Sequence, residues 1–142
     1  MGEETNRPAV EDRGEYSLML VGRDYVMRPS YEAIVAIEAA AGRGLVDVAR
    51  DAINAKLTLA DTALVACECI RAFGRDEDDR DAKGATAPRI ARLILDSDGG
   101  FHAAQQVVSG LLSLAVTGGF DSQGNLKPAT MKTMTTEAPV AG

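Results

Sequence analysis

The chain is poor in aromatic residues, which make up 4% of its 142 residues and include no tryptophan. Its hydrophobic content is nevertheless 46%, so the core has to be built mainly from Ala, Val, Ile and Leu. That composition favours helices packed through small side chains within a single domain. No apolar run reaches the roughly 18 residues that a membrane-spanning helix needs, so we expect no membrane partner.

Positive charge is also scarce. The chain has 15 Lys and Arg against 21 Asp and Glu, a net charge of -6. Because phosphate binding needs a basic surface, we expect no nucleic-acid partner. The first 15 residues are acidic and polar, unlike the basic and then apolar pattern of a secretory signal. We therefore expect a cytoplasmic protein.

Residues that could carry chemistry are few. His102 is the only histidine, and its helical neighbours Gln105 and Gln106 cannot replace the acid that would orient a catalytic base. The acidic runs that begin at Asp76 and Asp96 lack the glycine and glutamate positions of a calcium loop. Neither a phosphate-binding glycine loop nor a nucleophile motif is present. We expect no catalytic residue, no metal ion, no cofactor and no enzymatic activity.

The two cysteines, Cys67 and Cys69, fall within a predicted helix. Side chains at positions i and i+2 of a helix point about 200° apart, so the two thiols cannot share a metal ion or form an unstrained disulfide. We expect both to serve as small core residues in a reducing compartment.

The segment that begins at Tyr16 has the alternating pattern of a β-hairpin. With Gly22 and Arg23 as the loop, Leu20 would pair with Tyr25. One face then carries Leu18, Leu20, Tyr25 and Met27. The opposite face carries Met19 and Val26. Because an isolated hairpin is marginal in water, it has to pack on a helix or pair with another chain.

Helical periodicity predicts five helices, at about residues 31–41, 45–56, 59–73, 88–96 and 101–117. Ser30 and Thr58 are the expected N-caps of the first and third helices. Gly42 and Gly74 are expected to end them. The charged stretch 75–85 is predicted to be a flexible connection between the third and fourth helices.

These elements predict a single domain at residues 15–119, between a flexible leader at 1–14 and a flexible tail at 120–142. The tail has too few large apolar residues to offset the entropy lost on ordering. The predicted fold is α+β and mostly α. An N-terminal β-hairpin packs on a bundle of four to five short helices, with flexible termini.

The chain has more apolar positions than a compact small domain needs. Met19 and Val26 lie on the outer hairpin face, and Val107 and Leu114 flank the apolar stripe of the last helix. We predict these four side chains as contacts with an apolar partner or with a second copy of the chain. The alternative is that they belong to ordinary core packing.

The order of motifs from hairpin to helix resembles a known family over about residues 16–119. The matching residues are Arg28-Pro29-Ser30, Glu32-Ala33, Ile37-Glu38, Gly42, Gly44-Leu45 and Leu59-Ala60-Asp61. They are similar to the gene transfer agent family of tail proteins, encoded in alphaproteobacterial prophage-like clusters. That family looks like the tail assembly chaperones of long-tailed phages and is also labelled a tail tube protein.

The resemblance implies a non-enzymatic phage-tail assembly chaperone. Such a chaperone binds the tape measure protein in the host cytoplasm until tube subunits polymerise around it, so the tail tube protein is a second candidate partner. One alternative is a structural tube component of the particle, although tube proteins are usually rich in strands and only one hairpin is visible. Another alternative is a small regulatory or toxin-neutralising binding protein.

Overall fold

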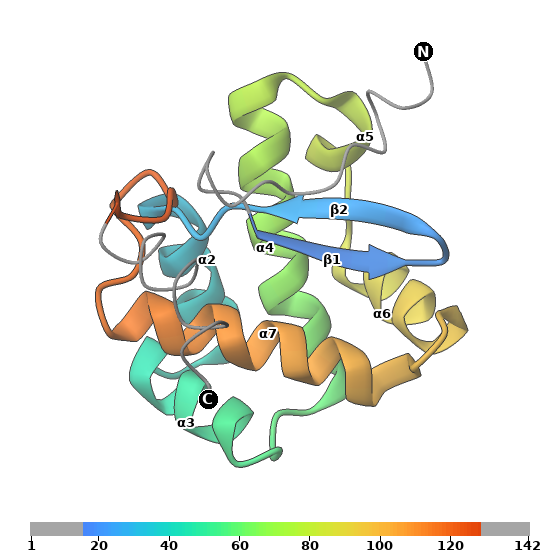
Figure 1. Cartoon of the computed structure of the whole chain (residues 1–142), viewed down its shortest axis with the longest axis horizontal. Coiled ribbons are helices and arrows are strands. Elements are labelled where there is room, and N and C mark those ends of the chain that lie inside the picture. The colour runs from blue at the N-terminus through green and yellow to red at the C-terminus, as the bar shows by residue number, and fades with distance from the viewer. Residues whose placement is uncertain (1–15, 129–142) are drawn as a thin grey trace, which may run out of the picture.

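The computed structural model describes residues 16–128, which form one β-hairpin and six helices (Figure 1). The elements are β1 (Tyr16–Leu20), β2 (Arg23–Met27), α2 (Tyr31–Ala41), α3 (Leu45–Ile53), α4 (Leu59–Glu77), α5 (Arg80–Lys83), α6 (Ala87–Asp96) and α7 (Gly100–Val116). The predicted fold class, a mostly helical α+β domain with an N-terminal hairpin, is confirmed. The predicted leader at 1–14 lies outside the described residues.

The hairpin pairs in a register that differs by two residues from the predicted one. Leu18 lies opposite Tyr25, and Leu20 lies opposite Arg23. The loop is Val21-Gly22, and both residues have positive φ, 51° and 76°. Two consecutive left-handed residues match the twist of the flanking strands in a tight hairpin. A shift of two preserves the side-chain alternation, so the predicted division into two faces is confirmed.

α4 is the central helix, and it contacts β2, α2, α5, α6 and α7. Figure 1 shows the hairpin crossing in front of α4, with α7 running below it and α3 below α7. The largest fully buried side chains come from all of these layers and include Leu20, Ile37, Ile70, Ile94, Leu111 and Leu112. The predicted N-caps are confirmed, because Ser30 accepts from the Ala33 N–H and Thr58 from the Asp61 N–H.

The stretch 75–85 is more ordered than the sequence predicts. α4 continues through Gly74 to Glu77, and α5 follows at once with Asp79 as its N-cap. Ala82 and Ala85 are buried in the core. Gly74 does not end its helix; it lies where α4 meets the backbone of Ala82 and Lys83. The prediction of a flexible charged connection is therefore wrong, because small apolar residues between the charges pack on α4.

The segment 120–128 is docked on the domain, although the sequence predicts a flexible tail from residue 120. Phe120 and Leu126 are buried and form an isolated antiparallel bridge. The Tyr31 N–H donates to the Ser122 carbonyl at 2.8 Å, which joins this segment to the start of α2. The predicted tail is therefore wrong for residues 120–128, where two apolar side chains and a turn at Gly124 suffice for docking. Residues 129–142 lie outside the described part of the chain.

Ion pairs tie the hairpin to the helices beside it. Arg23 of β2 donates to Asp81 of α5 at 2.7 Å, and Arg89 of α6 donates to the same carboxylate at 3.3 Å. Burial by itself raises the pKa of Asp81, but the two guanidinium groups outweigh it and hold the pKa below its usual value. One carboxylate therefore links three elements.

We expect Asp81→Asn to lower the free energy of unfolding at pH 7 by about 0.2–1 kcal/mol, the range for solvent-exposed ion pairs. The folded-state pKa is lowered, so the contribution of Asp81 is present above its unfolded pKa of about 3.9 and is lost as pH falls below it. Urea unfolding at pH 7 and near pH 3 measures the difference between wild type and variant. A difference that stays constant between the two pH values would contradict this role.

Both cysteines are buried, as predicted. Cys69 is fully enclosed in α4, and the Cys67 thiol donates to the Ala85 carbonyl at 3.4 Å. Burial raises the pKa of Cys67 to about 11 and raises that of Cys69 further. Since the thiolate is the reactive form, both thiols are protected by enclosure and by protonation.

We expect neither cysteine to react with an aromatic disulfide reagent at pH 8 in the native protein. Two equivalents should react after unfolding in guanidinium chloride. Val46→Cys supplies a positive control, because Val46 is 58% exposed on α3 and its replacement should react at once. Rapid reaction of the native wild-type chain would show that α4 opens more readily than its packing implies.

Candidate partner-binding groove

The hairpin presents two apolar side chains to solvent at the end of β1. Met19 is 55% exposed on the outer face of the strand, and Val21 is 56% exposed in the turn. Val21 has a left-handed φ of 51°. A β-branched residue is disfavoured there, since an L-residue in this region costs about 1–2 kcal/mol. The chain thus keeps an exposed apolar side chain at a position where asparagine or glycine would be easier.

The turn is attached to the corner between α6 and α7. The Val21 N–H donates to Ser97 Oγ at 2.9 Å, and Ser97 Oγ donates to the Leu93 carbonyl at 2.6 Å. Gly99 and Gly100, with φ of 82° and 55°, then turn the chain into α7. The serine therefore sets the position of the hairpin tip relative to both helices.

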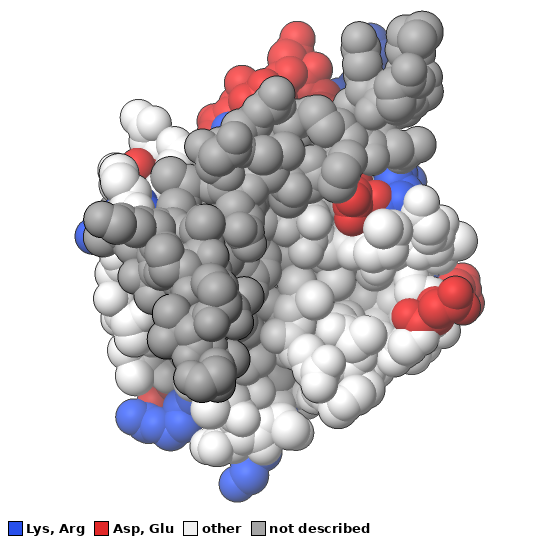
Figure 2. Space-filling model, in the orientation of Figure 1, with Lys and Arg blue, Asp and Glu red and all other residues white. Residues whose placement is uncertain are grey.

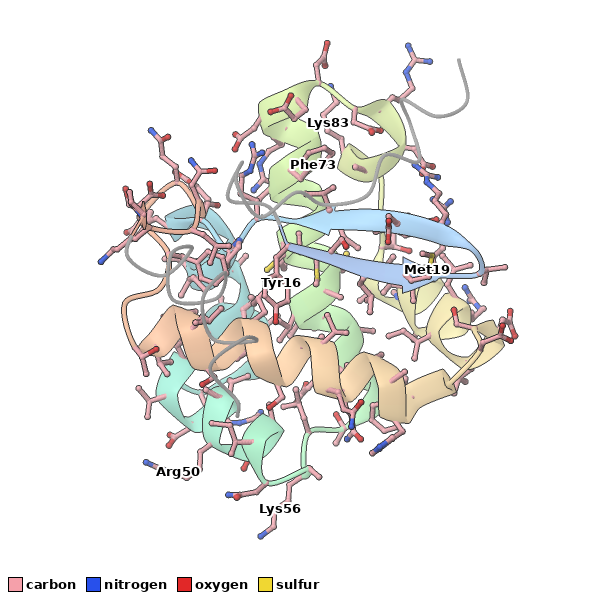
Figure 3. All side chains as sticks on the ribbon, viewed as in Figure 1. Tyr16, Met19, Arg50, Lys56, Phe73 and Lys83 are labelled. Atoms are coloured by element: carbon pink, nitrogen blue, oxygen red, sulfur yellow. The ribbon has the colours of Figure 1, made fainter. Side chains whose placement is uncertain are left out.

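A groove of about 540 Å³ lies between β1, this corner and the first half of α7. Its lining residues are Leu18, Met19, Leu20, Val21, Gly22, Asp96, Ser97, Asp98, Gly100, Ala103, Ala104 and Val107. Figure 3 places Met19 near the tip of the hairpin, above the region where α6 leads into α7. In Figure 2 the same region is largely uncharged surface, with acidic side chains at its outer edge.

The charge of the groove has one sign. Asp96 and Asp98 line it, and the lining includes neither lysine nor arginine. Within residues 16–128, neither carboxylate forms an ion pair. The start of α7 contributes about half a positive charge through its helix dipole, which two carboxylates outweigh. The groove is therefore apolar inside and negative at its rim.

The structure brings together two of the four residues predicted as contacts. Met19 and Val107 line the same groove from β1 and α7. Val26 is only 7% exposed, so the expectation of an open Val26 face is wrong. Leu114 is half-buried and lies two turns beyond Val107, near the C-terminal end of α7 and close to Gly119. Contact with a partner stays a prediction for all four residues.

Sequence reasoning does not identify Val21, Asp96 or Asp98 as groove residues. The predicted Gly22-Arg23 loop leaves Val21 outside the turn, since a Val-Gly loop is not among the common hairpin loops. The acidic run that begins at Asp96 does not match a calcium loop, and nothing else in its sequence pattern indicates a groove. The one available signal was a valine beside the glycine of a hairpin turn, where a small polar residue is more usual.

A second hollow lies between α3 and α7 and is lined by both polar and apolar residues. His102 lines it and lies 3.3 Å from Gln106 through the Nε2 atoms of the two side chains. In residues 16–128 no group of three or more His, Cys, Asp or Glu side chains is placed to hold a metal ion. The helices of this part of the chain also include none long and apolar enough to cross a membrane.

These features define a small helical domain with an N-terminal hairpin and an acidic-rimmed apolar groove. Residues 13–118 match the family described as phage tail tube protein, GTA-gp10, and the chain belongs to that family. It is thus a tail-related protein of the phage and gene transfer agent type, as the motif order predicts. Comparison with curated proteins and with solved structures gives no match.

Proposed function

We propose that this chain is a non-enzymatic tail assembly chaperone that binds the tape measure protein in the host cytoplasm. The observation that carries the proposal is the groove, in which exposed apolar side chains sit on a tethered hairpin tip. A chaperone needs such a surface, because it must cover an aggregation-prone client reversibly while staying soluble. The net charge of -6 supports solubility in the free state.

The structural alternative is a subunit of the tail tube, and the description of the family favours it. The described residues offer a sheet of only two strands. A tube built from stacked rings joins subunits through extended strand edges, and a hairpin of five-residue strands offers little edge for that. We therefore rank the chaperone role first and expect transient contact with tube subunits during assembly.

Particle composition separates the two functions. We expect an affinity-tagged chain, expressed with the tape measure protein of the same gene cluster, to co-purify with it. Finished particles purified by density gradient should lack the chain when their proteins are quantified by mass spectrometry. Stoichiometric presence in finished particles, at the level of the tube subunits, would overturn the chaperone role in favour of the tube component.

A further inference from the structure

We propose that the groove between β1 and α7 receives an amphipathic helix whose apolar ridge is flanked by lysine or arginine. This inference deepens the proposed function by naming the client-binding surface and the chemistry of the client segment. It rests on the apolar floor, on the two rim carboxylates, which form no ion pair within residues 16–128, and on the strained valine at the hairpin tip.

The charge of the rim selects among occupants. Asp96 and Asp98 line the groove, and its lining within residues 16–128 includes no lysine or arginine, so a partner that brings positive charge is favoured over one that brings negative charge. A second copy of the chain has a net charge of -6. Residues 1–15 contain five acids and two bases, so this segment is also mismatched to the rim. A basic partner from another chain fits best.

The short outer edge of β1 favours a helical partner segment over a partner strand added to the sheet. A third strand would have to pair along the outer edge of β1, which has only five residues. At the groove end of β1 the Val21 N–H already donates to Ser97 Oγ, so that end of the edge is closed. A helix needs no backbone pairing and can place side chains at i, i+3, i+4 and i+7 between Met19 and Val107.

The strain at Val21 points to selection for its side chain. Residues held in unfavourable backbone regions cluster at functional sites, and the inference runs from the outlier to the function. Val21 is exposed, so core packing gives no reason for valine there. Asparagine before glycine is the preferred sequence for this turn. The valine at this strained, exposed position therefore points to a contact between its apolar side chain and a partner.

Two synthetic 20-residue peptides probe the charge rule. They share one leucine stripe at helical spacing and carry either lysine or glutamate at the flanking positions. Fluorescence anisotropy at 0.1 M salt should show binding of the lysine peptide at least about tenfold tighter than that of the glutamate peptide. The ratio should shrink at 1 M salt, where charges are screened beyond about 3 Å. Equal affinities at low salt, or no binding of either peptide, would overturn the proposal.

Val21→Asn is expected to raise the stability of the protein and to weaken peptide binding. The variant should shift the urea midpoint upward, because it relieves the strained turn, and should weaken lysine-peptide binding about tenfold. Val46→Asn is the matched control, an equally exposed valine on α3 that should leave peptide binding unchanged. Unchanged binding by Val21→Asn would contradict a contact at the hairpin tip.

The paired variant Asp96→Asn with Asp98→Asn removes the rim charge. It should abolish the preference for the lysine peptide, whereas Glu32→Gln, at an exposed acid on α2, should keep it. Pull-down of the tape measure protein keeps the two proposals apart. Wild-type peptide preference without tape measure capture supports the groove and overturns the proposed client. Tape measure capture that is unaffected by Val21→Asn and by the paired variant supports the client and overturns the groove.

Discussion

Replacing Gly74 with valine is expected to lower the free energy of unfolding by about 3 kcal/mol, the upper part of the usual range for overpacked sites. A Cβ atom at this position would lie 2.7 Å from the Ala82 carbonyl carbon and 2.8 Å from Ala82 Cβ, and would also collide with the Lys83 amide nitrogen. Since two of these atoms belong to the backbone, α4 and α5 would have to separate. Removing glycine from a helix interior gains up to about 1 kcal/mol in helix propensity, which is too little to reverse the sign.

Gly84→Ala is the control for the substitution at Gly74, where α4 contacts α5. Gly84 follows α5, and a Cβ there would lie 3.4 Å from the Arg80 carbonyl oxygen, an ordinary contact. Its φ of -90° is also accessible to any residue. Chemical denaturation should therefore show a near-neutral effect for Gly84→Ala and a large loss for Gly74→Val. Similar effects at both glycines would mean that the α4–α5 contact yields easily.

Gly74 also explains where prediction from the sequence succeeds and where it stops. Local signals are sufficient for the hairpin faces, the Ser30 and Thr58 caps and the starts of the five predicted helices, because neighbouring residues encode them. Glycine is ambiguous, since the same residue can end a helix or allow a second backbone to approach. At Gly42 the first reading is correct, and the left-handed φ of 73° confirms it. At Gly74 the tertiary contact decides, and the helix runs on.

The groove could be predicted only in part for a related reason. Met19 and Val107 stood out individually, because each interrupts or flanks a regular apolar pattern. Their placement on one groove depends on the hairpin register and on the Ser97 tether, and neither follows from local sequence. Sequence periodicity identifies the apolar residues that a compact core does not need. The fold determines which of these residues remain exposed.

The second large effect concerns Gly124, where valine is expected to lower the free energy of unfolding by about 3 kcal/mol. Gly124 has a φ of 84°, and a Cβ there would lie 2.8 Å from the Ser30 nitrogen and 2.9 Å from the Pro29 carbonyl carbon. Left-handed strain accounts for about 1–2 kcal/mol of the loss, and the collision with the backbone before α2 accounts for the rest.

The stability lost in Gly124→Val has an upper bound. Residues 120–128 can detach from the domain, which relieves the strain. Undocking exposes Phe120 and Leu126, each of which contributes about 1.5–3 kcal/mol when buried. The strain is similar in size, so we expect Gly124→Val to undock the segment while α2 to α7 stay folded. Amide hydrogen exchange should then accelerate at Tyr31, whose N–H donates to the Ser122 carbonyl, and should stay slow in α4.

Gly118→Val is the control that separates the cost of backbone strain from the cost of the steric collision in Gly124→Val. Gly118 has a φ of 85°, nearly that of Gly124, but the nearest atom to an added Cβ is the flexible Lys127 Nζ at 3.7 Å. This variant should therefore lose only the strain component, about 1–2 kcal/mol, and keep slow exchange at Tyr31. Equal exchange rates at Tyr31 in the two variants would show that the approach of Gly124 to Pro29 and Ser30 does not hold the segment in place. Faster exchange at Tyr31 in Gly124→Val alone would assign a structural role to the Arg28-Pro29-Ser30 motif. The motif would then be the surface on which residues 120–128 dock after α7.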